Sequence, residues 1–158
     1  MIGRPKSGVD YHDTQGLNFK FTDLQAVIGV EQMKKIDTRV QLKKKLFATY
    51  REMLQGMPQV QFVQTNLADC APWFIDILLD GKQTRDNLAA FLKERGVMTR
   101  PFYPAIHTQP PYAGVKGAFP HSVSVSEKGL WLPSSAFLTG EDVRFVCSQI
   151  RDYFKTKS

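Results

Sequence analysis

Side chains that could bind an anionic or flat ligand gather in two stretches of the sequence. In the first stretch, the amide of Asn18 and the ammonium of Lys20 could both contact phosphate oxygens. An arginine can pair with a carboxylate or a diphosphate, and tyrosine rings can stack on a sugar or a base. The second stretch, rich in proline and aromatic residues, contains Arg100, Tyr103, His107 and Tyr112.

Several of these side chains also have a purely structural explanation. Asn18 could shape a turn before a helix, and His107 could hold its loop through backbone contacts. We interpret Trp73 and Trp131 as core or interdomain packing rather than as stacking platforms. The residues alone leave these alternatives open.

The sequence supports neither a metal site nor a disulfide framework. His12 and Asp13 are neighbours, but no further ligands accompany them, so we interpret them as a surface pair. The two cysteines form no CxxC motif and have no histidines at ligand spacing. Cys147 falls on the apolar face of a predicted helix, where we expect a buried, unreactive thiol.

The net charge of +6 raises the hypothesis of nucleic-acid binding. The densest lysine groups, at 34–35 and 43–45, fall on a predicted helix, where a solvated face explains them. No apolar run is long enough to span a membrane, and no secretory leader is recognisable. We therefore expect a cytoplasmic protein with neither a nucleic-acid nor a membrane partner. The positive charge also suits small anionic ligands such as nucleotides or phosphates.

A long helix is expected near the N-terminus. Residues Thr22 to Gln25 match a capping box, in which side chains satisfy the free backbone amides of a helix start. Apolar residues then recur at mostly helical spacing until Gly56, with Pro58 beyond. Unbroken, this helix would be roughly 50 Å long. It would extend past any core that this chain can build, so we expect part of it to pack on something else.

The remaining elements alternate between strands and helices. We expect Thr84 to cap a helix, Pro101 to keep its strand at a sheet edge, and Thr139 to begin the last helix. The expected elements are strands 60–64 and 73–80, a helix 84–96, a strand 97–102, a loop 102–120, a helix 121–129, a strand 130–135 and a final helix from 139. This order predicts a single domain with a two-layer α+β fold.

Four stretches resemble, in order and spacing, motifs of the DegT/DnrJ/StrS-type sugar aminotransferases. They are residues 16–26 with Gly29 and Gln32, residues 99–112, Phe119-Pro120 with residues 132–135, and residues 138–143. The resemblance covers nearly the whole chain. It implies the small C-terminal domain of a fold type I pyridoxal-phosphate enzyme, with a long N-terminal helix and a small, mainly antiparallel sheet covered by helices.

The resemblance also implies roles for both sets of residues. Asn18 occupies the position of an asparagine that reaches across the dimer to the cofactor phosphate. Lys20 stands where many relatives have arginine, so a point-charge contact is implied rather than a bidentate one. Arg100 could pair with the carboxylate of glutamate or with the diphosphate of a nucleotide sugar, and His107 could donate to the substrate. The substrate side of the cleft would be lined by Arg100, Tyr103, His107 and Tyr112.

The Schiff-base lysine of the family has no recognisable counterpart here. A transaminase needs this lysine and an acidic partner for the pyridine nitrogen of pyridoxal phosphate. The resemblance places both in a large domain that precedes the Asn18 segment. We therefore expect residues 1–22 to be an arm from that large domain and residues 23–158 to be the small domain. A fragment, a truncated gene product and half of a split enzyme all fit this interpretation.

The leading interpretation is one domain of a nucleotide-sugar aminotransferase that transfers an amine from glutamate to a keto sugar for polysaccharide biosynthesis. Alone, the chain is expected to be inactive and to bind no pyridoxal phosphate. Its partners would be the missing large domain and a second copy, contacted through the first helix. The alternative is a noncatalytic binding or assembly module derived from such an enzyme.

Overall fold

The computed structural model describes residues 11, 14, 16 and 21–156. Asn18 and Lys20 lie outside the described residues, as do His12 and Asp13. In chain order, the elements are α1 (Asp23–Met33), α2 (Ile36–Met53), β1 (Gln61–Phe62), β2 (Ile75–Leu78), α3 (Lys82–Glu94), β3 (Arg100–Pro101), the 3-10 helices η1 (Ile106–Thr108) and η2 (Pro110–Tyr112), α4 (Pro120–Lys128), β4 (Gly129–Leu132) and α5 (Gly140–Lys155). Apart from one break in the first helix, this order is the one expected from the sequence.

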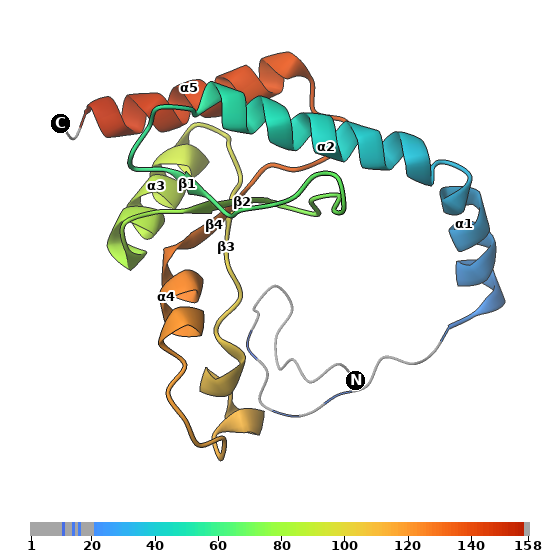
Figure 1. The fold of residues 1–158 in the computed structure, drawn as a ribbon, viewed down its shortest axis with the longest axis horizontal. Coiled ribbons are helices and arrows are strands. Elements are labelled where there is room, and N and C mark those ends of the chain that lie inside the picture. The colour runs from blue at the N-terminus through green and yellow to red at the C-terminus, as the bar shows by residue number, and fades with distance from the viewer. Residues whose placement is uncertain (1–10, 12–13, 15, 17–20, 157–158) are drawn as a thin grey trace.

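The four strands form one antiparallel sheet in the order β1-β2-β4-β3. Ile75 and Ile77 of β2 lie opposite Leu132 and Leu130 of β4, so these four side chains share one face. The helices α2 and α5 lie side by side over this face, and α3 packs beside them (Figure 1). The predicted two-layer α+β fold is therefore confirmed, and β3 with Pro101 is an edge strand as expected.

A single hydrophobic core fills the space between the sheet and these three helices. On α5, the apolar stripe expected to carry Cys147 is buried, and it includes Val143, Val146 and Ile150. Cys147 is buried on the same stripe, which confirms that expectation, and Thr139 caps the helix as predicted. Burying one large apolar side chain contributes about 1.5–3 kcal/mol, so this stripe holds α5 firmly on the core.

The predicted long helix is divided into two. α1 ends at Met33 and α2 begins at Ile36, because the backbone at Lys35 leaves the helical region, with φ −112° and ψ 3°. Three side chains of α2 are buried, namely Leu46, Phe47 and Tyr50. By contrast, the described chain buries no side chain of α1, which turns away from the axis of α2 (Figure 1). Helices in proteins are stabilised mainly by packing, so nothing in this part of the chain holds α1 in line with α2.

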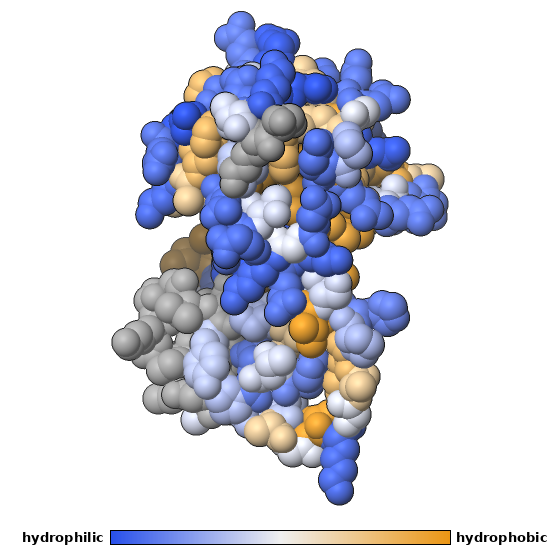
Figure 2. Space-filling model, turned by 90° about the vertical axis from the view of Figure 1, so that its left-hand side faces the viewer, coloured by the Kyte–Doolittle hydropathy of each residue, from blue (hydrophilic) through white to orange (hydrophobic). Residues whose placement is uncertain are grey.

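Apolar side chains are exposed along α1. Val27 is 62% exposed and Ile28 is 54% exposed, and Leu24, Val30 and Met33 are exposed as well. This agrees with the expectation that part of the first helix extends past the core. The side of the molecule away from α1 is different, because hydrophilic side chains cover much of its upper half (Figure 2).

One local prediction was wrong. α3 begins at Lys82 with Gly81 in the N-cap position, so Thr84 lies inside the helix and does not cap it. Trp73 is 78% exposed, so it does not pack in this core, and its packing on another domain stays a prediction, whereas Trp131 is 8% exposed and packs as expected. None of the helices between residues 21 and 156 is both long enough and apolar enough to cross a membrane.

Candidate functional site

The sheet face opposite the core carries a row of polar and aromatic side chains. Asp76 of β2, Trp131 of β4 and Arg100 of β3 lie opposite one another in adjacent strands. Directly opposed residues project from the same side of a sheet, so the three side chains share this face. Tyr103 follows β3, and its ring centroid lies 4.8 Å from that of Trp131. Two of the four predicted substrate residues therefore meet at Trp131.

Stacked aromatic rings restrict the tilt of the Trp131 indole. The ring centroids of Phe74 and Phe102 lie 4.3 Å and 5.1 Å from that of Trp131, and both pairs are stacked. Trp73 stacks in turn on Phe74 at 5.0 Å. Such pairs are worth about 0.5–1.5 kcal/mol each beyond the area that they bury. These four stacked rings, which we call the aromatic row, therefore form a stable base beneath Arg100 and Tyr103.

The guanidinium of Arg100 lies over this base. Its central carbon is 5.2 Å from the ring centroid of Tyr103 and 5.8 Å from that of Trp131. Contacts of this kind attract a cation to the negative face of an aromatic ring. Because a guanidinium can also bind a carboxylate or phosphate through two parallel hydrogen bonds, the arrangement suits an anionic ligand.

A first hollow, which we call the α4 hollow, lies between α4 and the aromatic row. Its volume is about 400 Å³, and it is lined by Phe102, Tyr103, His121, Ser122, Val125, Ser126 and Trp131. Aromatic rings provide most of one wall, and the hydroxyl and imidazole groups come from α4. A mostly apolar hollow with a few convergent polar groups is typical of small-molecule sites.

A second hollow, the loop hollow, lies in the proline-rich segment. Its volume is about 280 Å³, and it is lined by Ile106, His107, Tyr112, Val115, Phe119 and Ser122. The imidazole of His107 lies 4.7 Å from the ring of Phe119, measured between centroids. Ser122 lines both hollows. The structure thus places Tyr103 in one hollow and His107 with Tyr112 in its neighbour.

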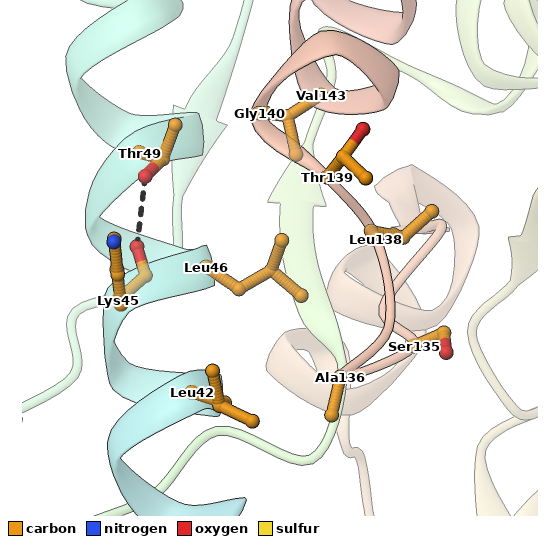
Figure 3. A pocket seen from close by; sticks show the side chains of 10 residues that line it. All are labelled: Leu42, Lys45, Leu46, Thr49, Ser135, Ala136, Leu138, Thr139, Gly140 and Val143. Atoms are coloured by element: carbon orange, nitrogen blue, oxygen red, sulfur yellow. Dashed lines mark hydrogen bonds between the residues drawn. The ribbon is translucent and has the colours of Figure 1, made fainter.

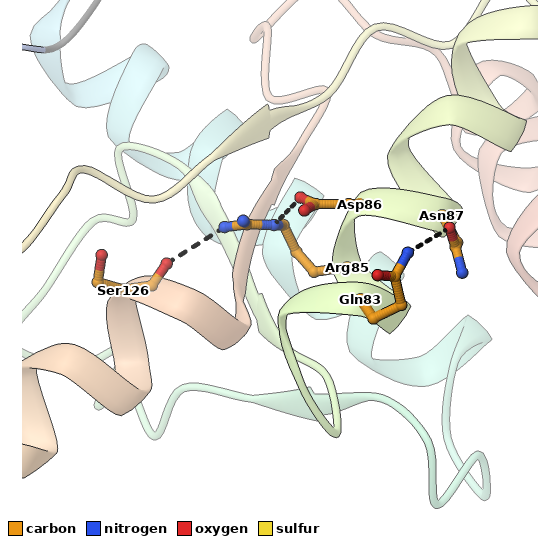
Figure 4. Close-up of polar contacts among 5 residues, drawn as sticks. All are labelled: Gln83, Arg85, Asp86, Asn87 and Ser126. Carbon is orange, nitrogen blue, oxygen red and sulfur yellow. Dashed lines mark hydrogen bonds and ion pairs between the residues drawn. The ribbon is translucent and has the colours of Figure 1, made fainter.

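A polar brace connects the α4 hollow to α3 (Figure 4). The buried guanidinium of Arg85 donates from Nη1 to the carbonyl oxygen of Ser126 at 3.2 Å and pairs through Nε with Asp86 at 2.6 Å. The Ser126 hydroxyl donates to the carbonyl oxygen of Tyr103 at 2.9 Å. Sequence patterns did not indicate Arg85, because an arginine on an amphipathic helix normally faces solvent.

Asp76 and Lys43 form a half-buried charge pair at the β2 side of this sheet face. Burial raises the pKa of Asp76, while its hydrogen bond with Trp131 and the charge of Lys43 act to lower it. Burial likewise lowers the pKa of Lys43, partly offset by the charge of Asp76. Sequence analysis missed both residues, because Asp76 interrupts an apolar strand and Lys43 belongs to a lysine run. An acidic residue inside an otherwise apolar strand is the signal that could have revealed the site.

Another cavity, of about 200 Å³, lies between α2 and the segment that leads into α5 (Figure 3). Apolar side chains such as Leu42, Leu46 and Leu138 provide most of its lining, and the hydroxyl of Thr49 donates to the carbonyl oxygen of Lys45 at 3.0 Å. None of the predicted site residues lines this cavity. We therefore place the candidate site at the two hollows.

The cavities described here do not offer the groups that pyridoxal phosphate requires. Lys45 lines the cavity beside α2, but no carboxylate shares that lining. Lys43 donates to two backbone carbonyls and does not line any of these cavities. Over residues 21–156, no three histidine, cysteine, aspartate or glutamate side chains come together as a metal site would require.

The chain resembles known proteins along nearly its whole length. The model of the DegT/DnrJ/EryC1/StrS aminotransferase family matches residues 2–151. GDP-perosamine synthase from Vibrio cholerae is 34% identical over 148 residues, which are 91% of this chain and 40% of that protein. dTDP-4-amino-4,6-dideoxy-D-glucose transaminase from Escherichia coli is 30% identical over 136 residues, which are 81% of this chain and 37% of that protein. The chain therefore spans about 40% of the length of these curated relatives.

Solved structures show the same fold. DesV from S. venezuelae superposes with a TM-score of 0.77 and 25% identity, over 96% of this chain and 41% of that chain. DesI, solved in the presence of its TDP-sugar product, superposes with a TM-score of 0.72 and 26% identity, over 86% of this chain and 36% of that chain. These matches confirm the fold that the sequence resemblance implied.

Proposed function

Because the chain belongs to the DegT/DnrJ/EryC1/StrS aminotransferase family, we propose that it is the small, C-terminal domain of a pyridoxal-phosphate-dependent nucleotide-sugar aminotransferase. The observation that carries this proposal is the family match over residues 2–151 in a chain that spans about 40% of its relatives. In this proposal, residues 1–22 are an arm linked to a large cofactor-binding domain, and residues 23–158 form the small domain.

The two hollows take the substrate in this proposal. Arg100 binds the carboxylate of glutamate in one half-reaction or a diphosphate oxygen of the nucleotide sugar in the other. Tyr103 and Tyr112 contact the sugar or base, and His107 donates a hydrogen bond. Support comes from the position of Tyr103, His107 and Tyr112 in two hollows that share Ser122, and from relatives whose names specify GDP- and dTDP-linked sugars.

The cofactor is held mainly by the missing domain. Pyridoxal phosphate, when bound there, would accept the amine from the donor and pass it to a keto sugar. We propose that Asn18 and Lys20 contact its phosphate across the dimer, with the amide donating and the ammonium supplying charge. In this proposal the Schiff-base lysine belongs to the large domain, so this chain is inactive without it.

The exposed apolar side chains of α1 are the proposed contact with these partners. A surface that carries Val27 and Ile28 in water is normally covered by another protein surface. In the complete enzyme this surface packs on the large domain or on a second subunit. It also supports a second candidate function, a noncatalytic assembly module that retains the domain and its docking helix. A cytoplasmic location remains a prediction from the sequence.

A chimera tests the first candidate. Residues 2–151 would replace the matching segment of the Vibrio cholerae GDP-perosamine synthase, and formation of GDP-perosamine would be measured. We expect a chimera that binds pyridoxal phosphate and is active. Arg100→Ala in the chimera should lower kcat/KM at least about tenfold, since charge-assisted contacts are worth about 1.5–3 kcal/mol. Arg95→Ala is the matched control, because Arg95 also lies over a ring, that of Phe91, but just after the last residue of α3.

A folded chimera that binds the cofactor and forms no product would contradict the proposal and favour the assembly module. The isolated chain provides a second test, by absorbance between roughly 320 and 450 nm after addition of pyridoxal phosphate. Borohydride trapping and mass mapping would then locate any modified lysine. We expect no specific adduct, and a single stoichiometric adduct would show that a lysine of this chain performs the covalent step.

A further inference from the structure

Asp76 occupies an unusual position for a carboxylate. It lies in the middle of β2, the strand that pairs with β4, and it is only partly exposed. Charged groups are seldom placed in the interior of a strand unless a partner compensates for the lost hydration. Asp76 has two such partners, because it lies directly opposite Trp131 in the adjacent strand, where its carboxylate can accept from the indole N–H, and it interacts with the charge of Lys43.

Lys43 holds three segments together beneath this carboxylate. Its ammonium donates to the carbonyl oxygens of Trp73 and Ser134, each at 2.5 Å. Trp73 precedes β2 and Ser134 follows β4, whereas Lys43 belongs to α2. The cation is therefore fixed from both strands, and its charge stays near Asp76 while the carboxylate contacts the indole.

The indole in turn supports the residues of the proposed site. The ring of Trp131 contacts that of Tyr103, with 4.8 Å between centroids, and lies 5.8 Å from the guanidinium carbon of Arg100. Its stacked neighbours restrict tilting of the ring, but a polar partner is what fixes the direction of the indole N–H. Asp76, directly opposite Trp131 in the adjacent strand, is placed to be the acceptor that supplies this restraint.

We propose that Asp76 is a positioning residue, which fixes the indole of Trp131 and thereby the placement of Arg100 and Tyr103 toward an anionic ligand. This inference rests on the proposed function only for the identity of that ligand, a nucleotide diphosphate. Loss of the carboxylate releases the indole, so that Arg100 and Tyr103 no longer share a fixed base. The fold itself depends on the opposite face of the sheet and remains.

The first test follows Trp131 by spectroscopy in the full chain. Trp73→Phe leaves Trp131 as the single tryptophan, since the sequence has two. The charged or titratable groups that face Asp76 and Trp131 are Lys43 from α2, Arg100 from β3, Tyr103 just after β3 and His121 from α4. His121→Gln is therefore added to the background. Protonation of Asp76 should change the Trp131 emission at a pH above the ordinary carboxylate range, because burial raises the pKa of Asp76.

Asp76→Asn should abolish this pH transition and increase acrylamide quenching of Trp131, whereas the far-UV circular dichroism stays unchanged. Asp80→Asn, at an exposed carboxylate just beyond β2, is the matched control and should keep the transition. An Asp76→Asn chain whose emission still titrates like its parent would overturn the inference. If Asp76→Asn fails to fold, Asp76→Glu provides the same readout with the charge retained, and its transition should persist.

Binding of GDP, the nucleotide in the name of the Vibrio cholerae relative, is measured separately by calorimetry. We expect Asp76→Asn to weaken GDP binding about tenfold and Asp80→Asn to leave it unchanged. Equal GDP affinities for Asp76→Asn and the parent chain would overturn the link from Trp131 to the ligand. Absence of GDP binding to the parent, with the Trp131 transition intact, would count against the proposed nucleotide site and in favour of the Asp76–Trp131 restraint.

Discussion

The ring of Phe102 lies so close to the α-carbon of Gly129 that a β-carbon at position 129 would overlap it. The two residues belong to neighbouring chain segments, and the N–H of Phe102 donates to the carbonyl oxygen of Gly129 at 3.1 Å. The φ angle of Gly129 is −77°, which any residue can adopt. Glycine is needed at this position because of the close approach of the ring and not because of the backbone conformation.

Gly129→Ala should therefore destabilise the chain by about 1–3 kcal/mol, since Phe102 must move and disturb its stack with Trp131. The measurement is urea unfolding together with near-UV circular dichroism, which reports the aromatic row. Gly114→Ala is the control, because a β-carbon at position 114 meets open space. Equal losses in both variants would show that the Phe102 contact does not determine the effect.

Arg85→Met should weaken the attachment of α4. The substitution keeps much of the side-chain volume but removes the hydrogen bond to Ser126, so we expect a loss of about 1–2 kcal/mol in urea unfolding. Gln83→Met removes an exposed hydrogen bond to Asn87 on the same helix and should change stability by less than about 0.5 kcal/mol. Faster hydrogen exchange in α4 of Arg85→Met alone would locate the effect. Unchanged exchange there would contradict the role of Arg85 as a brace.

Replacing Val27 and Ile28 of α1 together by serine should reduce self-association of the isolated chain. Both side chains are exposed and apolar, so covering them provides the driving force for association. Sedimentation velocity at several protein concentrations would measure the change. Phe145→Ser, on the exposed side of α5, is the control and should not alter the distribution. A double variant that associates like the parent chain would exclude α1 as the contact.

Stability should fall at alkaline pH. Burial raises the pKa of the Cys147 thiol from 9.0 to about 12, and burial also raises the pKa of the Tyr50 phenol. Because the folded-state pKa of Cys147 is the higher one, its contribution is complete below pH 9 and is lost as the pH rises from 9 to 12. The free energy of unfolding should decline over this window, and less steeply in Cys147→Val. Cys70→Ala, at an exposed thiol, should follow the parent curve.

The difference in burial between Cys147 and Cys70 should also appear in their rates of alkylation. At pH 8, iodoacetamide should modify Cys70 and leave Cys147 unmodified in the folded chain, because only an accessible thiolate reacts. Equal modification of both residues, measured by peptide mass mapping, would show that the core around Cys147 opens readily.

Local signals in the sequence predicted several elements well. Thr22 and Thr139 cap their helices as expected, because a capping box depends on residues only three positions apart. The stripe on α5 was predictable because helical periodicity depends only on spacing. The break at Lys35 was not predictable, since neither glycine nor proline marks it. It depends on where the core ends, which is a property of the packed chain.

The candidate site shows the same division. Arg100, Tyr103, His107 and Tyr112 were predicted from their types and from the family resemblance. Tyr103, His107 and Tyr112 line two adjoining hollows, and Arg100 lies over the ring of Tyr103. Asp76, Lys43 and Arg85 were missed, because each is defined by partners at least thirty positions away or on another element.

The sequence by itself determined the order of the elements, the caps at Thr22 and Thr139, the apolar stripe of α5 and the family, because these depend on short-range spacing and on residue type. Only the tertiary structure decided that Asp76, Trp131 and Arg100 form one row. Their alignment depends on the register between three strands that are far apart in the chain. A shift of one residue in that register would turn the row toward the core, so the pairing of the strands creates the site.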